Sequence, residues 1–455
     1  MVKDNHNKFQ RFRAEFDFFA YESFSINETP DGLRIVFNFN LDDKYSFNPD
    51  IVFVRSKINW NKLPPSGLEN FAFHLGLIEL LSYWKAACPS RILIKPFRLG
   101  EEQIDWWKNV WFQGLGEFFY LNNIKTSKDY FADVVCTSKS HAALHELALD
   151  EKKVIVPIGR GKDSAVTLEL LKDHYKCIPM IMNPRNASIS TASVAGFRRE
   201  EIFELHRSIH PQLLRLNDEG FLNGHTPFSA LLAFVSVVCA GLTGTKNIAL
   251  SNESSANEPT DPETGVNHQY SKSYEFERDF RNYTAKYTSA DINYFSFLRP
   301  LNEVGIANIF SGFSKYHSIF RSCNTGSKTD SWCGKCPKCL FTYILLSPVL
   351  AKGELTRIFN KNLLDDPKLL DIFEELTGLK DIKPFECVGT VDEVNYSLCR
   401  TVKKYPEPLP FLLKYYISSP LFQKYRNLSF DLQKLNPDHY LDDRMLAILN
   451  QANHG

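Results

Sequence analysis

A glycine-rich turn between two regular patterns has the residue types of a phosphate-binding loop. The β-branched run at residues 154–157 stops at residues 158–164, Ile-Gly-Arg-Gly-Lys-Asp-Ser, and a helical pattern starts directly afterwards. Glycines let the backbone approach an anion, and the N–H groups at the start of a helix point at it. A Walker loop needs Ser or Thr after Gly-Lys, but Asp163 follows Lys162, which excludes that motif. The alternative is an ordinary strand-to-helix turn with a surface Lys–Asp pair.

The end of this turn resembles the PP-loop of ATP pyrophosphatases, normally written Ser-Gly-Gly-x-Asp-Ser. Those enzymes cut ATP between the α- and β-phosphates and form adenylated intermediates. In this chain Gly159 replaces the usual Ser, and Arg160 replaces a Gly and must fit the backbone angles that Gly adopts easily. The resemblance implies a site for ATP and Mg²⁺ made of Gly159, Arg160, Gly161, Lys162, Asp163 and Ser164. Lys162 and Arg160 would neutralise phosphate charge, Asp163 would help hold Mg²⁺, and Ser164 would contact phosphate.

Four cysteines have the spacing of a metal site. Nine residues separate Cys323 from Cys333, and two-residue spacers separate Cys333, Cys336 and Cys339. Two-residue spacing lets neighbouring thiolates reach one tetrahedral zinc ion, and Gly334 eases the tight turn. Because four thiolates close the coordination sphere, this zinc would be structural rather than catalytic. An iron–sulfur cluster and free thiols in a loop are the alternatives.

The hydrophobic rhythm predicts an α/β fold from about residue 151 onwards. Strands are expected at residues 154–157, 177–182 and 247–250, and helices at residues 164–173, 196–207 and 228–242. This alternation favours a parallel sheet with helices on both faces, whose ligands bind beyond the carboxyl ends of the strands. The phosphate loop and the segments at residues 183–186 and 251–255 each follow a strand. We therefore expect these three segments to meet in one crevice.

Changes of pattern along the chain predict three regions. Residues 1–150 combine β-rich runs (12–19, 33–39 and 51–54) with helical patterns (68–87 and 101–122), as in an N-terminal α+β domain. Residues 151–345 would form a PP-loop ATP-binding domain of the adenine nucleotide alpha hydrolase type, with the four-cysteine knuckle. Residues 346–455 are expected to be mostly helical.

The composition limits the classes of partner. Lys plus Arg and Asp plus Glu each number 53, and this zero net charge argues against a general nucleic-acid binder. No apolar run approaches the length of a membrane span. The polar N-terminus lacks the apolar core of a signal peptide. We expect a cytoplasmic protein that binds neither nucleic acid nor membrane; no pattern indicates an oligomeric state.

Five further segments resemble a single family. They are residues 251–257, 266–273, 298–301, 332–339 and 383–389, and the likeness extends from about residue 68 to 400. The chain resembles the UDP-N-acetylmuramoyl-L-alanyl-L-glutamate epimerases of bacterial peptidoglycan synthesis, the MurL-type family. The resemblance implies an isomerase that acts on a UDP-sugar dipeptide and inverts its terminal L-glutamate to D-glutamate. It also implies dependence on ATP and Mg²⁺, release of AMP and diphosphate, and a role in cell wall biogenesis, cell shape and cell division.

An ATP site has a chemical purpose in such an epimerase. Removing an α-proton beside a free carboxylate is very hard, because the developing carbanion adjoins an existing negative charge. An acyl-adenylate no longer carries that charge, so a base can take the proton and an acid can return it on the other face. The candidates for these roles by residue type are His225, Glu253, His268, Lys272 and Cys387. For each of them a purely structural role is the alternative.

Three other functions fit parts of the pattern. An adenylating ligase or amidotransferase would pass the acyl-adenylate to an amine. A PP-loop with a late four-cysteine knuckle also resembles the deazaguanine synthases and tRNA-modifying ATP pyrophosphatases, but the neutral charge and the lack of a basic RNA-binding segment weigh against tRNA. A non-enzymatic nucleotide-binding or zinc scaffold is the third, since Arg160 could block the phosphate loop.

Overall fold

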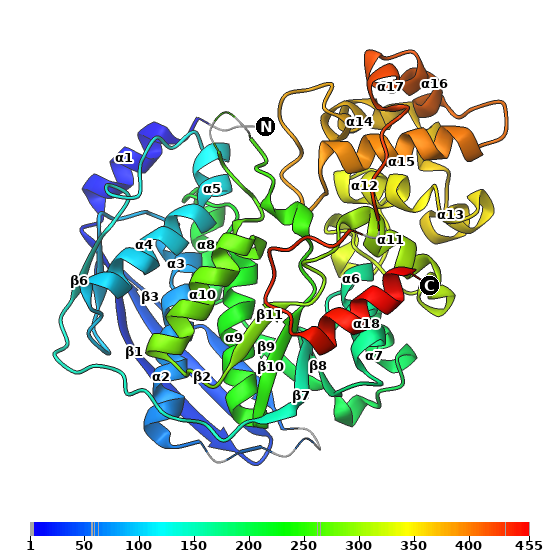
Figure 1. Ribbon diagram of the computed structural model, residues 1–455. Coiled ribbons are helices and arrows are strands. Elements are labelled where there is room, and N and C mark those ends of the chain that lie inside the picture. The colour runs from blue at the N-terminus through cyan, green and yellow to red at the C-terminus, as the bar shows by residue number, and fades with distance from the viewer. Residues whose placement is uncertain are drawn as a thin grey trace.

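One large mixed sheet runs through the molecule (Figure 1). The computed structural model describes residues 4–55, 58, 60–61, 63–261, 263, 265–432 and 434–454. Within these residues the sheet has 11 strands, and β3 (Tyr45–Phe47) pairs with β2 outside the main path. The order along the main path is β11 (Asn293–Ser296), β10 (Thr245–Leu250), β7 (Asp150–Pro157), β8 (Lys176–Met182), β9 (Phe203–Arg207), β4 (Asp50–Val54), β2 (Gly32–Leu41), β1 (Phe18–Thr29), β5 (Arg91–Ile94) and β6 (Asp133–Cys136).

The predicted parallel sheet is confirmed only in part. Strands β11, β10, β7, β8 and β9 pair in parallel, as do β1, β5 and β6. The pairs β9–β4, β4–β2 and β2–β1 are antiparallel. The N-terminal strands thus join the edge of the parallel part through β4 and β9, and strands from residues 18–296 share one sheet.

Two predicted elements are wrong, because their residues are buried with a different period from the one expected. Residues 196–207 were expected to be a helix, but they include β9, where Phe203 and Leu205 are buried and alternate with less buried neighbours. Residues 12–19 were expected to be a strand, but α1 (His6–Glu15) occupies their first part. Its buried residues Phe9 and Phe12 are three positions apart, on one helical face. The other strands and helices predicted from residue 151 to 250 are confirmed, with ends shifted by a few residues.

Alternate side chains of the central strands pack into two separate hydrophobic cores, one on each face of the sheet. Ile155 of β7 packs into one core, whereas its neighbours Val154 and Val156 pack into the other. Ile248 and Ala249 of β10 divide in the same way. This two-residue alternation explains why β-branched, fully apolar strands form here, since both faces of the sheet are covered.

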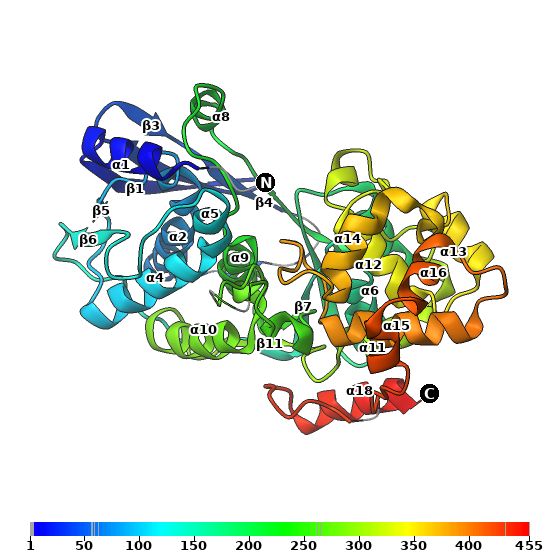
Figure 2. The ribbon, with the colours of Figure 1, turned by 90° about the horizontal axis from the view of Figure 1, so that it is seen from above.

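Helices cover the two faces of the central strands. Viewed from above, α2 (Pro65–Glu79), α9 (Phe228–Thr243) and α10 (Tyr274–Tyr287) lie on one side of β7, whereas α6 (Lys162–Leu171), α11 (Glu303–Ser311) and α12 (Pro337–Leu346) lie on the other (Figure 2). The remaining helices of the first 220 residues are α3 (Leu81–Trp84), α4 (Glu101–Gly114), α5 (Gly116–Leu121), α7 (Asn186–Val194) and α8 (Pro211–Asp218). No helix within the described residues combines the length and apolarity that a membrane span requires.

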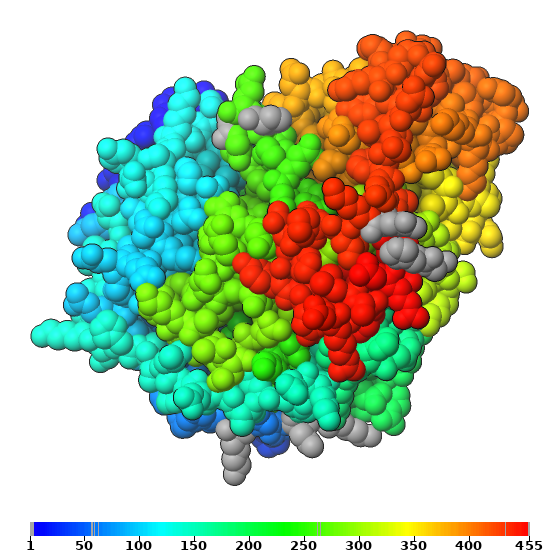
Figure 3. All heavy atoms as spheres, viewed as in Figure 1, coloured from blue at the N-terminus to red at the C-terminus, as the bar shows by residue number. Residues whose placement is uncertain are grey.

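The C-terminal part is helical, as its sequence predicts. It contains α13 (Lys352–Phe359), α14 (Leu370–Thr377), α15 (Val391–Lys404), α16 (Phe411–Ile417), α17 (Pro420–Tyr425) and α18 (Asp443–His454). The last of these packs on α6 and α11. In the space-filling view this segment, coloured red, lies on the surface between the green and the yellow-to-orange parts of the chain (Figure 3).

Candidate functional site

The glycine-rich loop opens into a cavity of about 550 Å³. Strand β7 ends at Pro157, and α6 begins after Gly161, whose backbone is extended. A Cβ added at Gly159 would meet no atom within 4 Å, so the backbone there faces open space. Arg160 does not enter the positive-φ region that glycine tolerates, so its side chain causes no backbone conflict. The loop therefore keeps the open backbone and helix N-terminus that phosphate binding requires.

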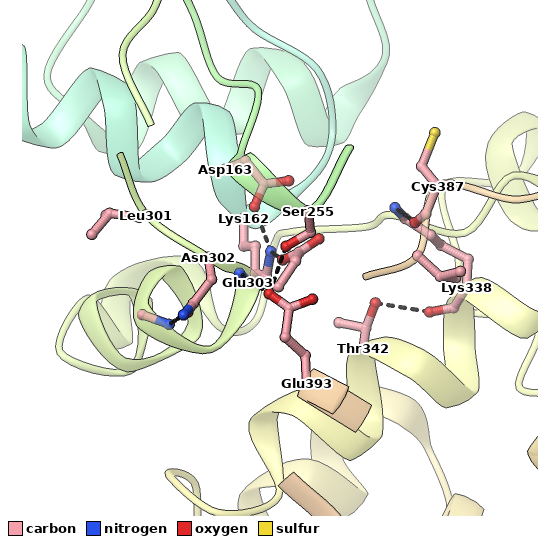
Figure 4. Close-up of polar contacts among 12 residues, drawn as sticks. Lys162, Asp163, Ser255, Leu301, Asn302, Glu303, Lys338, Thr342, Cys387 and Glu393 are labelled. Atoms are coloured by element: carbon pink, nitrogen blue, oxygen red, sulfur yellow. Dashed lines mark hydrogen bonds and ion pairs between the residues drawn. The ribbon is translucent and has the colours of Figure 1, made fainter. Parts of the chain in front are cut away.

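Of the six residues predicted to bind the nucleotide, Lys162 differs from the rest. The other five, Gly159, Arg160, Gly161, Asp163 and Ser164, line the cavity. Lys162 is only 4% exposed, so the alternative of a surface Lys–Asp pair is wrong. Its ammonium group forms ion pairs with the carboxylates of Asp163 and Glu303 (Figure 4).

The surroundings of Lys162 form a buried charge network. Burial alone would lower the pKa of Lys162, but the carboxylates of Asp163 and Glu303 raise it well above its ordinary value. Burial raises the pKa of the Glu303 carboxyl to about 7, against the attraction of Lys162. Glu393 accepts hydrogen bonds from the Glu303 backbone N–H at 2.7 Å and from the Ser255 hydroxyl at 2.5 Å. The charge of Lys162 is thus already compensated by protein groups.

Arg160 connects the loop to the cysteine-rich segment. Its Nη2 donates to the carbonyl oxygen of Cys323 at 3.1 Å, and its Nη1 lies 3.9 Å from Oδ1 of Asp330. The Arg160 carbonyl accepts from the backbone N–H of Arg321 at 2.6 Å. These contacts hold the side chain to one side of the loop, so it leaves the loop open.

A second polar cluster lines the same cavity. His225, His268, Lys272 and Cys387 all border it. His225 precedes α9, His268 and Lys272 lie before α10, and Cys387 lies in the irregular segment between α14 and α15. The Lys272 ammonium donates to the Cys387 sulfur at 3.1 Å, and the sulfur lies 4.0 Å from Nε2 of His268. Four of the five predicted proton-transfer candidates therefore meet.

A carboxylate that the sequence analysis missed supports this cluster. Oε2 of Glu117, on α5, lies 2.5 Å from Nδ1 of His268 and 3.3 Å from Nδ1 of His225. The two imidazole rings are 4.7 Å apart. Glu117 is 151 positions from His268 in sequence, and no local motif marks it. Only the tertiary fold brings it to the site.

The cluster separates positive and negative charge. Burial would raise the pKa of the Cys387 thiol, but Lys272 and His268 lower it well below its ordinary value. Burial would lower the pKa of His268, but hydrogen bonds to Cys387 and Glu117 raise it to about 9. Burial lowers the pKa of His225 to about 4, despite its proximity to Glu117. These shifts favour a thiolate at Cys387, an imidazolium at His268 and a neutral imidazole at His225.

The fifth candidate, Glu253, occupies a different position. Its side chain is 5% exposed and is not among those that line the cavity. Burial raises the pKa of its carboxyl group. Its backbone oxygen accepts from Arg299 at 2.6 Å, and Arg299 also donates to the backbone oxygen of Lys272 and pairs with Glu277 at 3.0 Å. The fully buried Arg299 therefore fixes the backbone on which Lys272 stands.

The four cysteines converge as their spacing predicts. The Sγ–Sγ distances are 3.7 Å for Cys323–Cys336, 3.8 Å for Cys333–Cys339 and 3.5 Å for Cys336–Cys339. A zinc ion with Zn–S bonds of about 2.3 Å needs tetrahedral edges of about 3.8 Å, whereas a disulfide needs about 2.0 Å. In an iron–sulfur cluster the four thiolates are shared among two or four irons, so they do not all gather around one point as these four sulfurs do, within 4.8 Å of one another. The sulfur positions therefore fit a single tetrahedral zinc ion.

The cysteine cluster also lies close to the cavity. Cys336 caps the start of α12, and Lys338, between two of the cysteines, donates to the backbone oxygen of Cys387 (Figure 4). Gln269 donates to the backbone oxygen of Val388 at 3.1 Å. The segment that carries Cys387 is thus held from both sides, by the cysteine-rich helix and by the His268 segment.

Comparison with known proteins gives a consistent result along most of the chain. Residues 10–297 match the MurL N-terminal domain and residues 317–407 match the MurL C-terminal domain. UDP-N-acetyl-alpha-D-muramoyl-L-alanyl-L-glutamate epimerase from Xanthomonas oryzae pv. oryzae is 35% identical over 323 residues, which cover 69% of this chain and 70% of that protein. Proteins with the same name from Salinispora tropica (34%, covering 70% of both chains) and a Micromonospora species (32%, covering 70% and 72%) are also similar. No solved structure matches.

Proposed function

Because the chain belongs to the MurL family, we propose that it inverts the terminal L-glutamate of UDP-N-acetylmuramoyl-L-alanyl-L-glutamate to D-glutamate in peptidoglycan precursor synthesis. The name that these relatives share supplies the substrate and the isomerase class. The reaction consumes ATP, proceeds through an acyl-adenylate, and releases AMP and diphosphate. The observation that carries this proposal is that the phosphate-type loop and the Cys387 cluster border one cavity.

The loop end of the cavity is suited to a nucleotide with Mg²⁺. The open backbone at Gly159 and the N-terminus of α6 would hold the phosphates, and Asp163 would help bind the cation. The Ser251 hydroxyl borders the cavity and, among the described residues, has no hydrogen-bond partner, so it is available to a ligand. Bound ATP would supply the adenylyl group that removes the negative charge of the substrate carboxylate.

The other end of the cavity is suited to proton transfer beside a carbonyl group. The Lys272 ammonium and the His268 imidazolium provide positive charge where an enolate oxygen would develop. The groups that face this space, His225, His268, Lys272 and Cys387, come from different segments of the chain. Removal of a proton from one face of the substrate's α-carbon and its return on the other face require groups on different sides. Charged groups in a site shielded from water stabilise an enolate far more than they would in solution.

The four-cysteine cluster completes the proposed cofactor set. We assign it a structural zinc ion bound by Cys323, Cys333, Cys336 and Cys339, in line with the sulfur spacing. This zinc would fix the start of α12 and, through Lys338, the segment that carries Cys387.

Incubation with the UDP-sugar dipeptide, ATP and Mg²⁺ in D₂O tests the function. Chiral amino-acid analysis and mass spectrometry should find D-glutamate with one deuterium, and AMP and diphosphate should form only when the dipeptide is present. AMP release without inversion or deuterium would overturn the epimerase and direct attention to an acyl acceptor, as in a ligase. Absence of both AMP and ATP binding would instead point to a nucleotide-free scaffold.

A further inference from the structure

Three residues of the cavity stand in the order of a nucleophilic triad. The Cys387 sulfur lies 4.0 Å from Nε2 of His268, and Nδ1 of the same ring lies 2.5 Å from Oε2 of Glu117. A thiol, an imidazole and a carboxylate in this sequence are the arrangement that activates a nucleophile and orients its base. The Lys272 ammonium, 3.1 Å from the sulfur, adds a second positive charge beside it. Proton transfer by a general acid and a general base alone would not require a thiol, an imidazole and a carboxylate in sequence.

The charges facing Cys387 favour a nucleophile over a base. Lys272 and His268 face it from the segment before α10, Lys338 from α12, and Glu386 is its neighbour in the chain. The positive charges of Lys272, His268 and Lys338 hold the pKa of the thiol well below its ordinary value. A thiolate of low pKa is a poor base for a carbon-bound proton. Its nucleophilicity, however, falls only about half as steeply as its basicity when the pKa is lowered. Such a thiolate also leaves readily from an acyl group.

We propose that Cys387 forms a thioester with the substrate's activated acyl group before inversion, with His268 as its base and Glu117 as the residue that positions His268. This inference rests on the proposed function and extends it. The thiolate adds to the carbonyl carbon of the acyl-adenylate, the new S–C bond forms, and the C–O bond to AMP breaks with its electron pair leaving on AMP. The acyl group then sits next to Lys272.

The remaining steps balance through the same residues. A base removes the α-proton of the thioester, and a solvent-derived proton is added to the opposite face of the enolate. Acylation neutralises the thiolate, which removes a charge that raises the pKa of His268, so His268 can release its proton and act as a base. Water then adds to the thioester carbonyl and the C–S bond breaks. Of the two protons released, one restores the His268 imidazolium and the other passes to solvent.

The same neutralisation identifies a candidate for the α-proton base. The Cys387 charge is one of the main causes that raise the pKa of Lys272 above its ordinary value. Once the sulfur is acylated, that support is lost and the ammonium releases a proton more readily. Lys272 is then a base that becomes available only after the substrate is attached.

Acid-quench mass spectrometry tests the thioester directly. The intact chain, mixed with UDP-sugar dipeptide, ATP and Mg²⁺, should gain the mass of the substrate minus water on the peptide that contains Cys387, and hydroxylamine should remove it. Cys387→Ala should show no adduct and at least a 1000-fold slower inversion. It should still release about one equivalent of diphosphate per chain, because adenylation does not need the thiol. Cys136→Ala, which alters a half-buried thiol on β6 outside the cavity, should behave as the unaltered protein.

These outcomes separate the two proposals. Inversion with AMP release but no adduct at any quench time, together with inversion by Cys387→Ala at more than a tenth of the normal rate, would overturn the thioester and leave the epimerase intact. Failure of the unaltered protein to release diphosphate or form D-glutamate would overturn both.

Thiol alkylation gives a readout that needs neither ATP nor substrate. The rate of iodoacetamide modification at Cys387 should be nearly flat between pH 6 and pH 9. His268→Gln should lower the rate at pH 6.5 at least tenfold and make it rise with pH. Glu117→Gln should shift the profile in the same direction, and Glu117→Asp should restore part of it, which a merely structural role would not do. Profiles identical to that of the unaltered chain in both His268→Gln and Glu117→Gln would overturn the triad.

Discussion

Replacing Lys162 with Met should destabilise the protein, and the loss should grow as the pH rises. Met keeps the length of the side chain but removes the ammonium group that pairs with Asp163 and Glu303. Breaking a buried ion pair of this kind costs about 3–5 kcal/mol, and the Glu303 side chain is only 4% exposed. The Asp163 side chain is 29% exposed, so its lost pairing adds less than about 1 kcal/mol.

The pH dependence follows from a proton that Glu303 takes up. Without Lys162, the buried carboxyl group avoids an unpaired charge by staying protonated in the folded state, and its pKa rises further above the value of about 7. In the unfolded chain the same group is ionised above its ordinary pKa of about 4.3. A raised carboxyl pKa stabilises the fold at low pH, and this contribution is lost as pH rises. Above pH 7 the variant should therefore lose about 1.4 kcal/mol per pH unit, or about 2 kcal/mol between pH 7.0 and pH 8.5.

Urea unfolding followed by tryptophan fluorescence at several pH values between 7.0 and 8.5 measures this slope. In the unaltered chain Glu303, with a pKa of about 7, is half protonated at pH 7.0 and releases the rest of its proton by pH 8.5, so its stability should fall by only about 0.4 kcal/mol. The double variant Lys162→Met/Glu303→Gln lacks the Glu303 carboxyl group that takes up the proton, so the slope should return to that of Glu303→Gln alone. A Lys162→Met loss below about 1 kcal/mol, or one equal at both ends of the pH range, would refute the assignment of Lys162 as the neutralising partner of Glu303.

Three further predictions concern the loop, the cysteines and the backbone support. Gly159→Ala should keep the unfolding free energy within about 0.5 kcal/mol, because a Cβ there meets no protein atom within 4 Å. It should weaken ATP binding at least tenfold by calorimetry, because the same Cβ occupies the open space that a phosphate would fill. Gly353→Ala, equally open but outside the cavity, is the matched control, and equal ATP affinity in both variants would contradict a phosphate loop. Metal analysis should find one zinc per chain, which Cys336→Ser should lose together with a lower Tm; a metal-free chain with an unchanged Tm would count against the zinc site. Arg299→Met should cost about 3–5 kcal/mol in urea unfolding because buried Glu277 loses its partner, whereas near-normal stability would show that the pair is dispensable.

Local chemistry explains what the sequence predicts correctly. The strand, loop and helix around Gly159 form as expected, because β-branched residues, glycines and a helical pattern follow one another within about 20 residues. The cysteine sulfurs converge because two-residue spacers fix their distances almost independently of the rest of the fold. Cys387, His268 and Lys272 were candidates by residue type alone, and only the structure brings them together.

Tertiary contacts explain what the sequence analysis missed. Glu303 lies 141 positions from Lys162, and Glu117 lies 151 positions from His268, so no spacing rule connects either pair. The antiparallel joining of β4 to β9 has the same origin. Both strands alternate buried residues with less buried ones, a pattern that edge strands and central strands share. The pairing of β4 with β9 is therefore decided only when the two parts of the sheet meet.

The late position of Cys387 in the chain also sets when the protein becomes reactive during synthesis. A ribosome delivers the loop, Glu117, His268 and Lys272 more than 100 residues before the thiol. Until the segment between α14 and α15 docks, Cys387 lacks the two cations that ionise it and remains an ordinary thiol toward oxidants and alkylating metabolites. In the proposed mechanism the chain therefore gains its reactive thiolate only after the other groups of the cluster have been synthesised.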